Sequence, residues 1–138
     1  MRGSRIKALR TAVWIAEMIL AVFYAAAGLL KMFVPMDELP VIIAWTGDYS
    51  EGFVRFTGFI DLLAAGGILL PDLLRIWSWM TILAALGSAA LQILAIVFHL
   101  WRGEFAVLLV NFSALALSGF IIWGWAKTHS PAESHTRL

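Results

Sequence analysis

Five polar residues of kinds that bind ligands or move protons lie within or beside long apolar runs: Lys31, Asp61, Gln92, His99 and Asn111. An ammonium group, a carboxylate and an imidazole can hold the carbonyl groups of a small ligand and exchange protons with it. Ionisable side chains inside a membrane span are costly and usually face the protein interior. The sequence therefore predicts a polar core or ligand-binding site, for which Tyr24 and Phe56 could supply an aromatic wall.

The spacing of the polar residues places one polar stripe on each of four helices. At about 100° per residue, separations of seven, eleven or fourteen return to nearly the same helix face. The stripes are Glu17, Tyr24, Gly28 and Lys31; Gly58, Asp61 and Ala65; Thr81, Ser88, Gln92 and His99; and Glu104, Asn111 and Ser118. Small residues along them allow close helix approach. We expect a bundle with a polar interior, concentrated in its outer half.

Each polar residue also has a purely structural interpretation, and these alternatives stay open. Because helical side chains lean toward their own N-terminus, Lys31 and Asp61 should approach each other, either to serve a ligand or only to fix the register of two helices. Lys31 could instead snorkel outward. His99 could be an ordinary interfacial histidine, and Gln92 and Asn111 could be interhelical hydrogen-bond partners.

Two further groups of ionisable residues are expected at the membrane surfaces. Glu17 lies near the inner end of its apolar run, where water can reach it. Arg102 and Glu104 flank a turn at the outer end, where a solvated ion pair is the simplest interpretation.

Four apolar stretches of roughly membrane-spanning length must position these residues. They cover 11–34, 53–70, 76–98 and 105–127, and about 20 residues cross the hydrocarbon core as a helix. The chain is 62% hydrophobic and 14% charged, too apolar for a soluble domain of 138 residues. We predict an all-α fold, an antiparallel bundle of four transmembrane helices in a single domain over 1–127, followed by a disordered cytoplasmic tail over 128–138.

The connections between the stretches differ in length. Those at 71–75 and 99–104 are tight, which favours antiparallel neighbours. The long connection at 35–52 is acidic, but its 41–45 portion is apolar. It is expected to be a short segment on the outer interface or a simple loop.

Charge and tryptophan placement give one orientation. Seven cations fall on the side of the two termini: Arg2, Arg5, Lys7, Arg10, Arg75, Lys127 and Arg137. The same threading places five tryptophans at that interface (Trp14, Trp77, Trp79, Trp123 and Trp125) and two at the other (Trp45 and Trp101). By the positive-inside rule both termini are cytoplasmic.

Composition also excludes several classes of site. The net charge of +1 gives no basis for nucleic-acid binding, and the absence of cysteine excludes thiol nucleophiles, cysteine-bound zinc and iron–sulfur clusters. Of the three histidines, His129 and His135 fall in the predicted tail, so one chain cannot hold a bis-histidine haem. We predict no metal site.

Several segments together resemble the DoxX-like family of small prokaryotic four-helix membrane proteins. The matching segments are 23–33, 54–71, 98–100 and 102–104; the family pattern commonly has glutamate where this chain has Asp61. The resemblance implies the fold and a bacterial cytoplasmic (inner) membrane. Named relatives are linked to sulfur oxidation with quinone as electron acceptor, to membrane redox complexes or to receptor assembly, and most have no assigned reaction.

These observations leave three classes of function, and leave open whether the chain catalyses a reaction. The first is an accessory subunit of a membrane oxidoreductase system, with a quinone or small lipophilic ligand in the outer half of the bundle. The second is an assembly or scaffold factor without catalysis. The third is a small proton-coupled transporter that would use Glu17. The expected partners are the lipid bilayer and either a redox-complex subunit or further copies of the chain.

Overall fold

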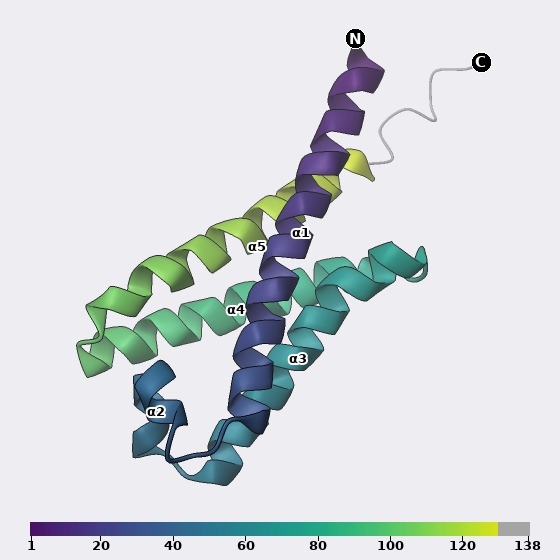
Figure 1. Cartoon of the computed structure of the whole chain (residues 1–138). Coiled ribbons are helices and arrows are strands. Elements are labelled where there is room, and N and C mark those ends of the chain that lie inside the picture. The colour runs from purple at the N-terminus through teal and green to yellow at the C-terminus, as the bar shows by residue number, and fades with distance from the viewer. Residues whose placement is uncertain (130–138) are drawn as a thin grey trace. The chain divides into compact units, whose positions relative to one another are not determined.

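The computed structural model describes residues 1–129 as helices joined by short turns, with no strand in this range (Figure 1). The elements are α1 (Arg2–Phe33), α2 (Leu39–Ile42), η1 (Ala44–Asp48), α3 (Glu51–Leu74), α4 (Trp79–Arg102), η2 (Phe105–Val107) and α5 (Leu108–Thr128). Four helical stretches are long and apolar enough to cross a membrane: Gly3–Phe33, Glu51–Leu74, Trp79–Arg102 and Phe105–Thr128. The all-helical fold with four candidate spans is confirmed. Most of the expected tail lies outside the described residues.

The turn between α3 and α4 comes later than the sequence predicted. α3 continues through Pro71 to Leu74 although proline removes one backbone hydrogen bond. Helices of membrane proteins tolerate such a proline because the remaining backbone groups still bond internally. Arg75 then adopts a left-handed conformation (φ 55°), and Ile76 N–H donates to the Pro71 carbonyl at 3.0 Å, which ends the helix.

The burial pattern is that of a protein in lipid. Large apolar side chains such as Leu94 and Leu109 are 67% and 75% exposed, whereas the polar stripes face inward. The buried polar residues are Glu17, Thr46, Asp61, Thr81, Ser88, Gln92, His99, Asn111 and Ser118. Apart from Thr46, all lie on the predicted stripes, so the assignment of helix faces is confirmed.

The chain forms two compact units. The central unit, Met18–Ala84, contains the second half of α1, the connection with α2 and η1, α3 and the first turns of α4. The terminal unit contains Met1–Glu17 and, within the described residues, 85–129. The arrangement of four helices as one antiparallel bundle stays a prediction.

Two glycines bring α1 and α3 together in the central unit. A Cβ on Gly28 would lie 2.9 Å from the Gly58 carbonyl oxygen, and a Cβ on Gly58 would lie 2.8 Å from Lys31 Cβ. Any larger residue would push the helices apart. This close contact sets the distance across which Lys31 and Asp61 meet.

The helices of the terminal unit also meet through small and hydroxyl residues. Ser88 on α4 and Ser118 on α5 share a hydrogen bond of 2.7 Å, and Ser118 Oγ also donates to the Ala114 carbonyl at 2.9 Å. A Cβ on Gly124 of α5 would collide with Val13 of α1. These contacts hold α4, α5 and the first turns of α1 together.

The connection between α1 and α3, called the outer segment after its expected position, is ordered into short helical turns. α2 and η1 occupy most of the long connection, where the sequence favoured an interfacial segment or a simple loop. Leu39 and Thr46 are fully buried, and Thr46 Oγ1 donates to the Ile43 carbonyl at 2.7 Å. The segment is therefore anchored to the central unit by its own side chains.

Candidate functional site

A buried ion pair lies where the C-terminal end of α1 meets the first half of α3. Lys31 Nζ donates to Asp61 Oδ2 at 2.7 Å, and the two side chains are 12% and 8% exposed. The predicted approach of these residues is confirmed, and the alternative in which Lys31 snorkels outward is wrong. The geometry follows from the sequence, because Gly28 and Gly58 each lie one turn before a member of the pair and let the backbones approach.

An aromatic cluster of Trp45, Tyr49 and Phe53 lies beside the ion pair. Lys31 Nζ lies over the Trp45 ring, 5.4 Å from its centroid. The ring centroids of Tyr49 and Phe53 are 5.7 and 6.3 Å from that of Trp45. A cation held over an indole face is favoured by the ring quadrupole, more so away from water. Lys31 is thus held by a carboxylate on one side and an aromatic face on another.

The aromatic cluster was not among the residues predicted for the site. Trp45 was predicted only as an anchor at the outer interface, because helical periodicity says nothing about the path of the outer segment. The apolar character of 41–45 was the one available signal that this segment would fold back rather than extend into water.

Arg55 fastens α3 to the end of α1. Its guanidinium donates to the carbonyls of Lys31 at 2.5 Å and Val34 at 2.9 Å, and to the Glu51 carboxylate at 3.1 Å. The last carbonyls of a helix have no partner within the helix, so this arginine satisfies groups that lipid could not. The backbone that carries Lys31 is therefore fixed by a side chain from α3.

The two predicted wall residues lie in different environments. Tyr24 is 1% exposed and meets the Phe23 ring edge to face at 5.2 Å, so it belongs to the interior. Phe56 is 59% exposed and lies about 140° around α3 from Asp61. Contrary to the expectation that it walls the site, Phe56 faces away from the ion pair.

The remaining predicted core residues belong to the terminal unit. Gln92, His99 and Asn111 are 3%, 9% and 8% exposed, on the inward faces of α4 and α5. Their burial fits the predicted stripes. A single site formed by these three together with Lys31 and Asp61 stays a prediction.

A cluster of three ionisable residues closes the turn between α4 and η2. His99 Nδ1 and Glu104 Oε2 are 2.6 Å apart, and Arg102 Nε donates to Glu104 Oε1 at 2.8 Å. The turn places them there, because Gly103 has a left-handed φ of 71° and Glu104 N–H donates to the His99 carbonyl at 2.9 Å. The expectation of a solvated Arg102–Glu104 pair is corrected, since both side chains are largely buried and His99 joins them.

The carboxyl group of Glu104 is stabilised in its charged form. Removal from water alone would raise its pKa, but the hydrogen bonds from His99 and Arg102, with their charges, outweigh this effect. The pKa of Glu104 therefore lies below its usual 4.5. A group whose pKa is lowered by folding stabilises the fold above its unfolded pKa, and this stabilisation is lost as the pH falls.

Glu104→Gln is expected to lower the free energy of unfolding at neutral pH by about 1 kcal/mol, since a charged hydrogen-bond acceptor is lost. The difference from the wild-type protein should shrink as the pH falls from neutral through 4.5 and below, the usual pKa of the group. Thermal unfolding of both proteins in detergent, at several pH values across this range, measures the difference in stability. A difference that stays constant with pH contradicts the assignment.

The environment of Glu17 also differs from the one expected from the sequence. It was expected to be solvated near the membrane surface, but its side chain is fully buried in the terminal unit. Glu17 and Tyr24 lie on the same face of α1, and both are buried. The carboxyl group therefore faces the interior.

Comparison with known proteins agrees with the four apolar helices. No curated protein and no solved structure matches the chain. A family model described as the DoxX-like family matches residues 15–121, which is well over half of the sequence. The matched region includes the ion pair, the aromatic cluster and the turn at Gly103. The chain therefore belongs to the DoxX-like family of membrane proteins.

Proposed function

We propose that the chain is an accessory subunit of a membrane oxidoreductase system and binds a quinone ring beside the Lys31–Asp61 pair. The observation that carries this proposal is the position of the pair: it is buried in an apolar helix pair, yet it is bordered by the aromatic cluster and keeps 12% and 8% of its side chains exposed. This remaining exposure supports binding of a ligand at the edge of the pair.

The chemistry of the site suits a quinone. Such a ligand needs an apolar slot with a few polar groups that hold its carbonyl oxygens and exchange protons. The Lys31 ammonium group has three donors, one of which bonds Asp61. The others could donate to a carbonyl oxygen, Asp61 could hold a proton, and the Trp45 and Tyr49 rings could stack on the quinone.

Electron transfer is assigned to a partner subunit. The sequence has no cysteine for an iron–sulfur cluster, and the resemblance to subunits of quinone-linked systems concerns assemblies rather than single chains. In this proposal the chain holds the ligand and its proton, while a partner supplies the electrons.

The orientation belongs to the same proposal. We place both termini on the cytoplasmic side of a bacterial inner membrane, which puts the ion pair in the outer half of the bilayer. Support comes from the cations Arg5, Lys7 and Arg10 at the start of α1 and Lys127 at the end of α5. The outer segment, in contrast, carries the acidic residues Asp37, Glu38 and Asp48.

The test is quinone binding by the full chain after mild extraction. Bound quinone is measured by mass spectrometry, and affinity by competition against a photoreactive quinone analogue. Trp45→Ala is expected to weaken binding about tenfold, because stacking of a flat ring on an aromatic side chain contributes about 1–3 kcal/mol. Trp101→Ala is the matched control, since Trp101 is 81% exposed and lies on α4 in the terminal unit.

Two outcomes decide against the proposal. Absence of any extracted or crosslinked quinone would leave the ion pair with a structural role and favour an assembly or scaffold factor. Equal labelling of the Trp45→Ala and wild-type chains would place the ligand elsewhere. In a scaffold factor, substitutions of the pair should lower protein abundance and change no ligand binding.

A further inference from the structure

The Lys31–Asp61 ion pair leaves hydrogen-bonding groups unused on both of its members. The ammonium group has three N–H groups. One donates to Asp61 Oδ2 at 2.7 Å, and neither of the others meets an acceptor among the described residues. The second carboxylate oxygen, Asp61 Oδ1, receives no hydrogen bond from the described residues. The pair therefore offers spare donors and a spare, negatively charged acceptor.

The unused groups are not sealed off by the packing. The side chains of Lys31 and Asp61 keep 12% and 8% of their surface exposed. Asp61 Oδ1 is not fully enclosed by its neighbours, so it forms part of this exposed edge. A carboxylate oxygen in apolar surroundings is costly unless it accepts a hydrogen bond. The edge of the pair therefore suits a ligand atom that donates a hydrogen bond as well as accepting one.

The direction of these groups is fixed before a ligand binds. Arg55 holds the backbone at the end of α1 by donating to the carbonyls of Lys31 at 2.5 Å and Val34 at 2.9 Å. The contact between Gly28 and Gly58 sets the distance between the two helices. Because the donors and the acceptor are already in place, binding loses little free energy to ordering them.

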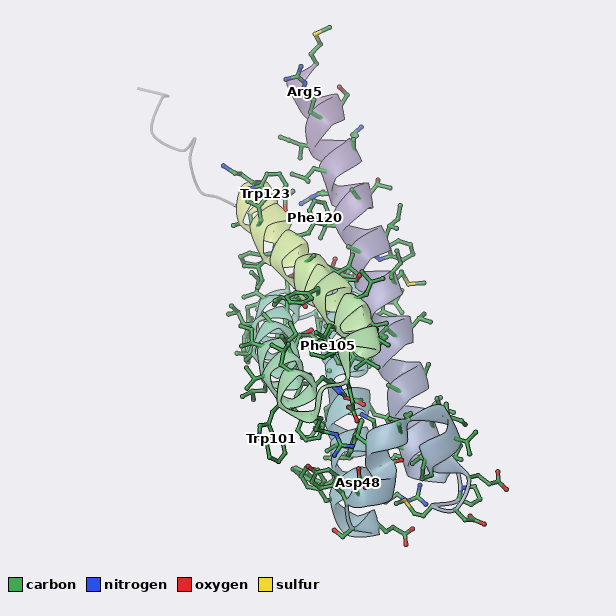
Figure 2. The ribbon with its side chains drawn as sticks, turned by 90° about the vertical axis from the view of Figure 1, so that its left-hand side faces the viewer. Arg5, Asp48, Trp101, Phe105, Phe120 and Trp123 are labelled. Atoms are coloured by element: carbon green, nitrogen blue, oxygen red, sulfur yellow. The ribbon has the colours of Figure 1, made fainter. Side chains whose placement is uncertain are left out.

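The aromatic cluster borders the same edge. Lys31 Nζ lies 5.4 Å from the centroid of the Trp45 ring. Figure 2 shows the turn that ends at Asp48, which carries Trp45, beside the C-terminal end of α1. A flat ring packed against the cluster would place an oxygen on its rim against the ion pair. The chemistry of that oxygen then decides which ring binds better.

We propose that the site binds the reduced ring, a quinol, more tightly than the oxidised quinone; this inference rests on the function proposed above. A quinone oxygen can only accept hydrogen bonds, so it engages Lys31 and leaves Asp61 Oδ1 unmatched. A quinol hydroxyl accepts from Lys31 and donates to Oδ1. Since a hydrogen bond to a charged group is worth about tenfold in affinity, the quinol is expected to bind about tenfold more tightly.

This preference would assist the partner subunit that supplies electrons. Tighter binding of the reduced form raises the midpoint potential of the bound ring. A tenfold preference corresponds to about 30 mV for a two-electron couple. The bound quinone would therefore be easier to reduce than quinone free in the bilayer.

The test is isothermal titration calorimetry of the full chain in mild detergent under nitrogen, with a decyl-substituted benzoquinone and its quinol as separate ligands. The wild-type chain should bind the quinol about tenfold more tightly. Asp61→Asn keeps the size of the side chain but removes the charged acceptor, so it should weaken quinol binding about tenfold and bring the two affinities together. Asp37→Asn is the matched control, because Asp37 is an exposed acid of the same unit and its loss should change neither affinity.

The outcomes separate this inference from the proposed function. If neither ring binds, the proposed function fails and the inference fails with it. Equal affinities, or tighter binding of the quinone, overturn the inference alone, as does an equal loss for both rings in Asp61→Asn.

A second variant keeps the test decisive if Asp61→Asn does not fold. Trp45→Ala removes a stacking surface that does not distinguish the two rings. It should weaken both by the same factor and leave the quinol preference at about tenfold. A preference lost in Trp45→Ala would assign the selectivity to the aromatic cluster and overturn the role of Asp61.

Discussion

Lys31→Met is expected to lower the free energy of unfolding by about 3–5 kcal/mol, because it leaves a buried carboxylate without its partner. Asp61 is 6% exposed, and its side chain reaches Lys31 Nζ at 2.7 Å. Methionine keeps the length of the lysine stem, so the contact with Gly58 is preserved and the loss is electrostatic. Unfolding by added denaturing detergent at neutral pH, followed by tryptophan fluorescence, measures the change.

The double variant Lys31→Met with Asp61→Leu identifies the cause. Replacing a buried ion pair by apolar residues of similar size is often neutral, so most of the lost stability should return. Lys7→Met, at an exposed lysine of the same helix, should change stability by less than about 0.5 kcal/mol. If the double variant is as unstable as Lys31→Met, the two residues do not act as a pair.

The double variant also separates structure from function. If it folds as well as the wild-type chain but binds no quinone, the ion pair is retained for the ligand. If it folds and binds quinone normally, the pair only fixes the register of α1 and α3. The sequence left these two interpretations open, and a distance of 2.7 Å satisfies both.

The buried faces of the helices were predictable from the sequence. Ser88 and Ser118 were assigned to inward stripes by periodicity alone, and they meet in a hydrogen bond of 2.7 Å. In a membrane this assignment is reliable because lipid excludes polar groups more strongly than it attracts apolar ones. The same reasoning placed Lys31 opposite Asp61.

The parts of the site outside the regular helices were not predictable in this way. Trp45 reaches Lys31 because α2 and η1 fold back, and no periodicity determines the path of such a segment. Arg55 caps the end of α1, and helical periodicity does not predict such a contact between a side chain and the backbone of another helix. Glu17 was judged from its depth along the sequence, whereas its burial depends on the helices packed around it.

The close contact between α1 and α3 leaves no room for a larger residue at Gly58. Helix propensity alone says that alanine in place of glycine stabilises a helix by about 1 kcal/mol. At Gly58 this gain is opposed by contacts of 2.8 Å to Lys31 Cβ and 3.1 Å to the Gly28 carbonyl oxygen. Neither neighbour is the free end of a flexible side chain, so the helices themselves must move.

Gly58→Ala is therefore expected to lower the free energy of unfolding by about 1–3 kcal/mol, the usual cost of overpacking. Gly87→Ala is the matched control, because nothing lies within 4 Å of a Cβ at Gly87 on α4, and it should raise stability by up to about 1 kcal/mol. Detergent unfolding measures both. The two substitutions are expected to have opposite effects because only Gly58 lies against a neighbouring helix. A stabilised Gly58→Ala variant would therefore show that α1 and α3 do not meet at these glycines. The Lys31–Asp61 pair would then have to be positioned by other contacts.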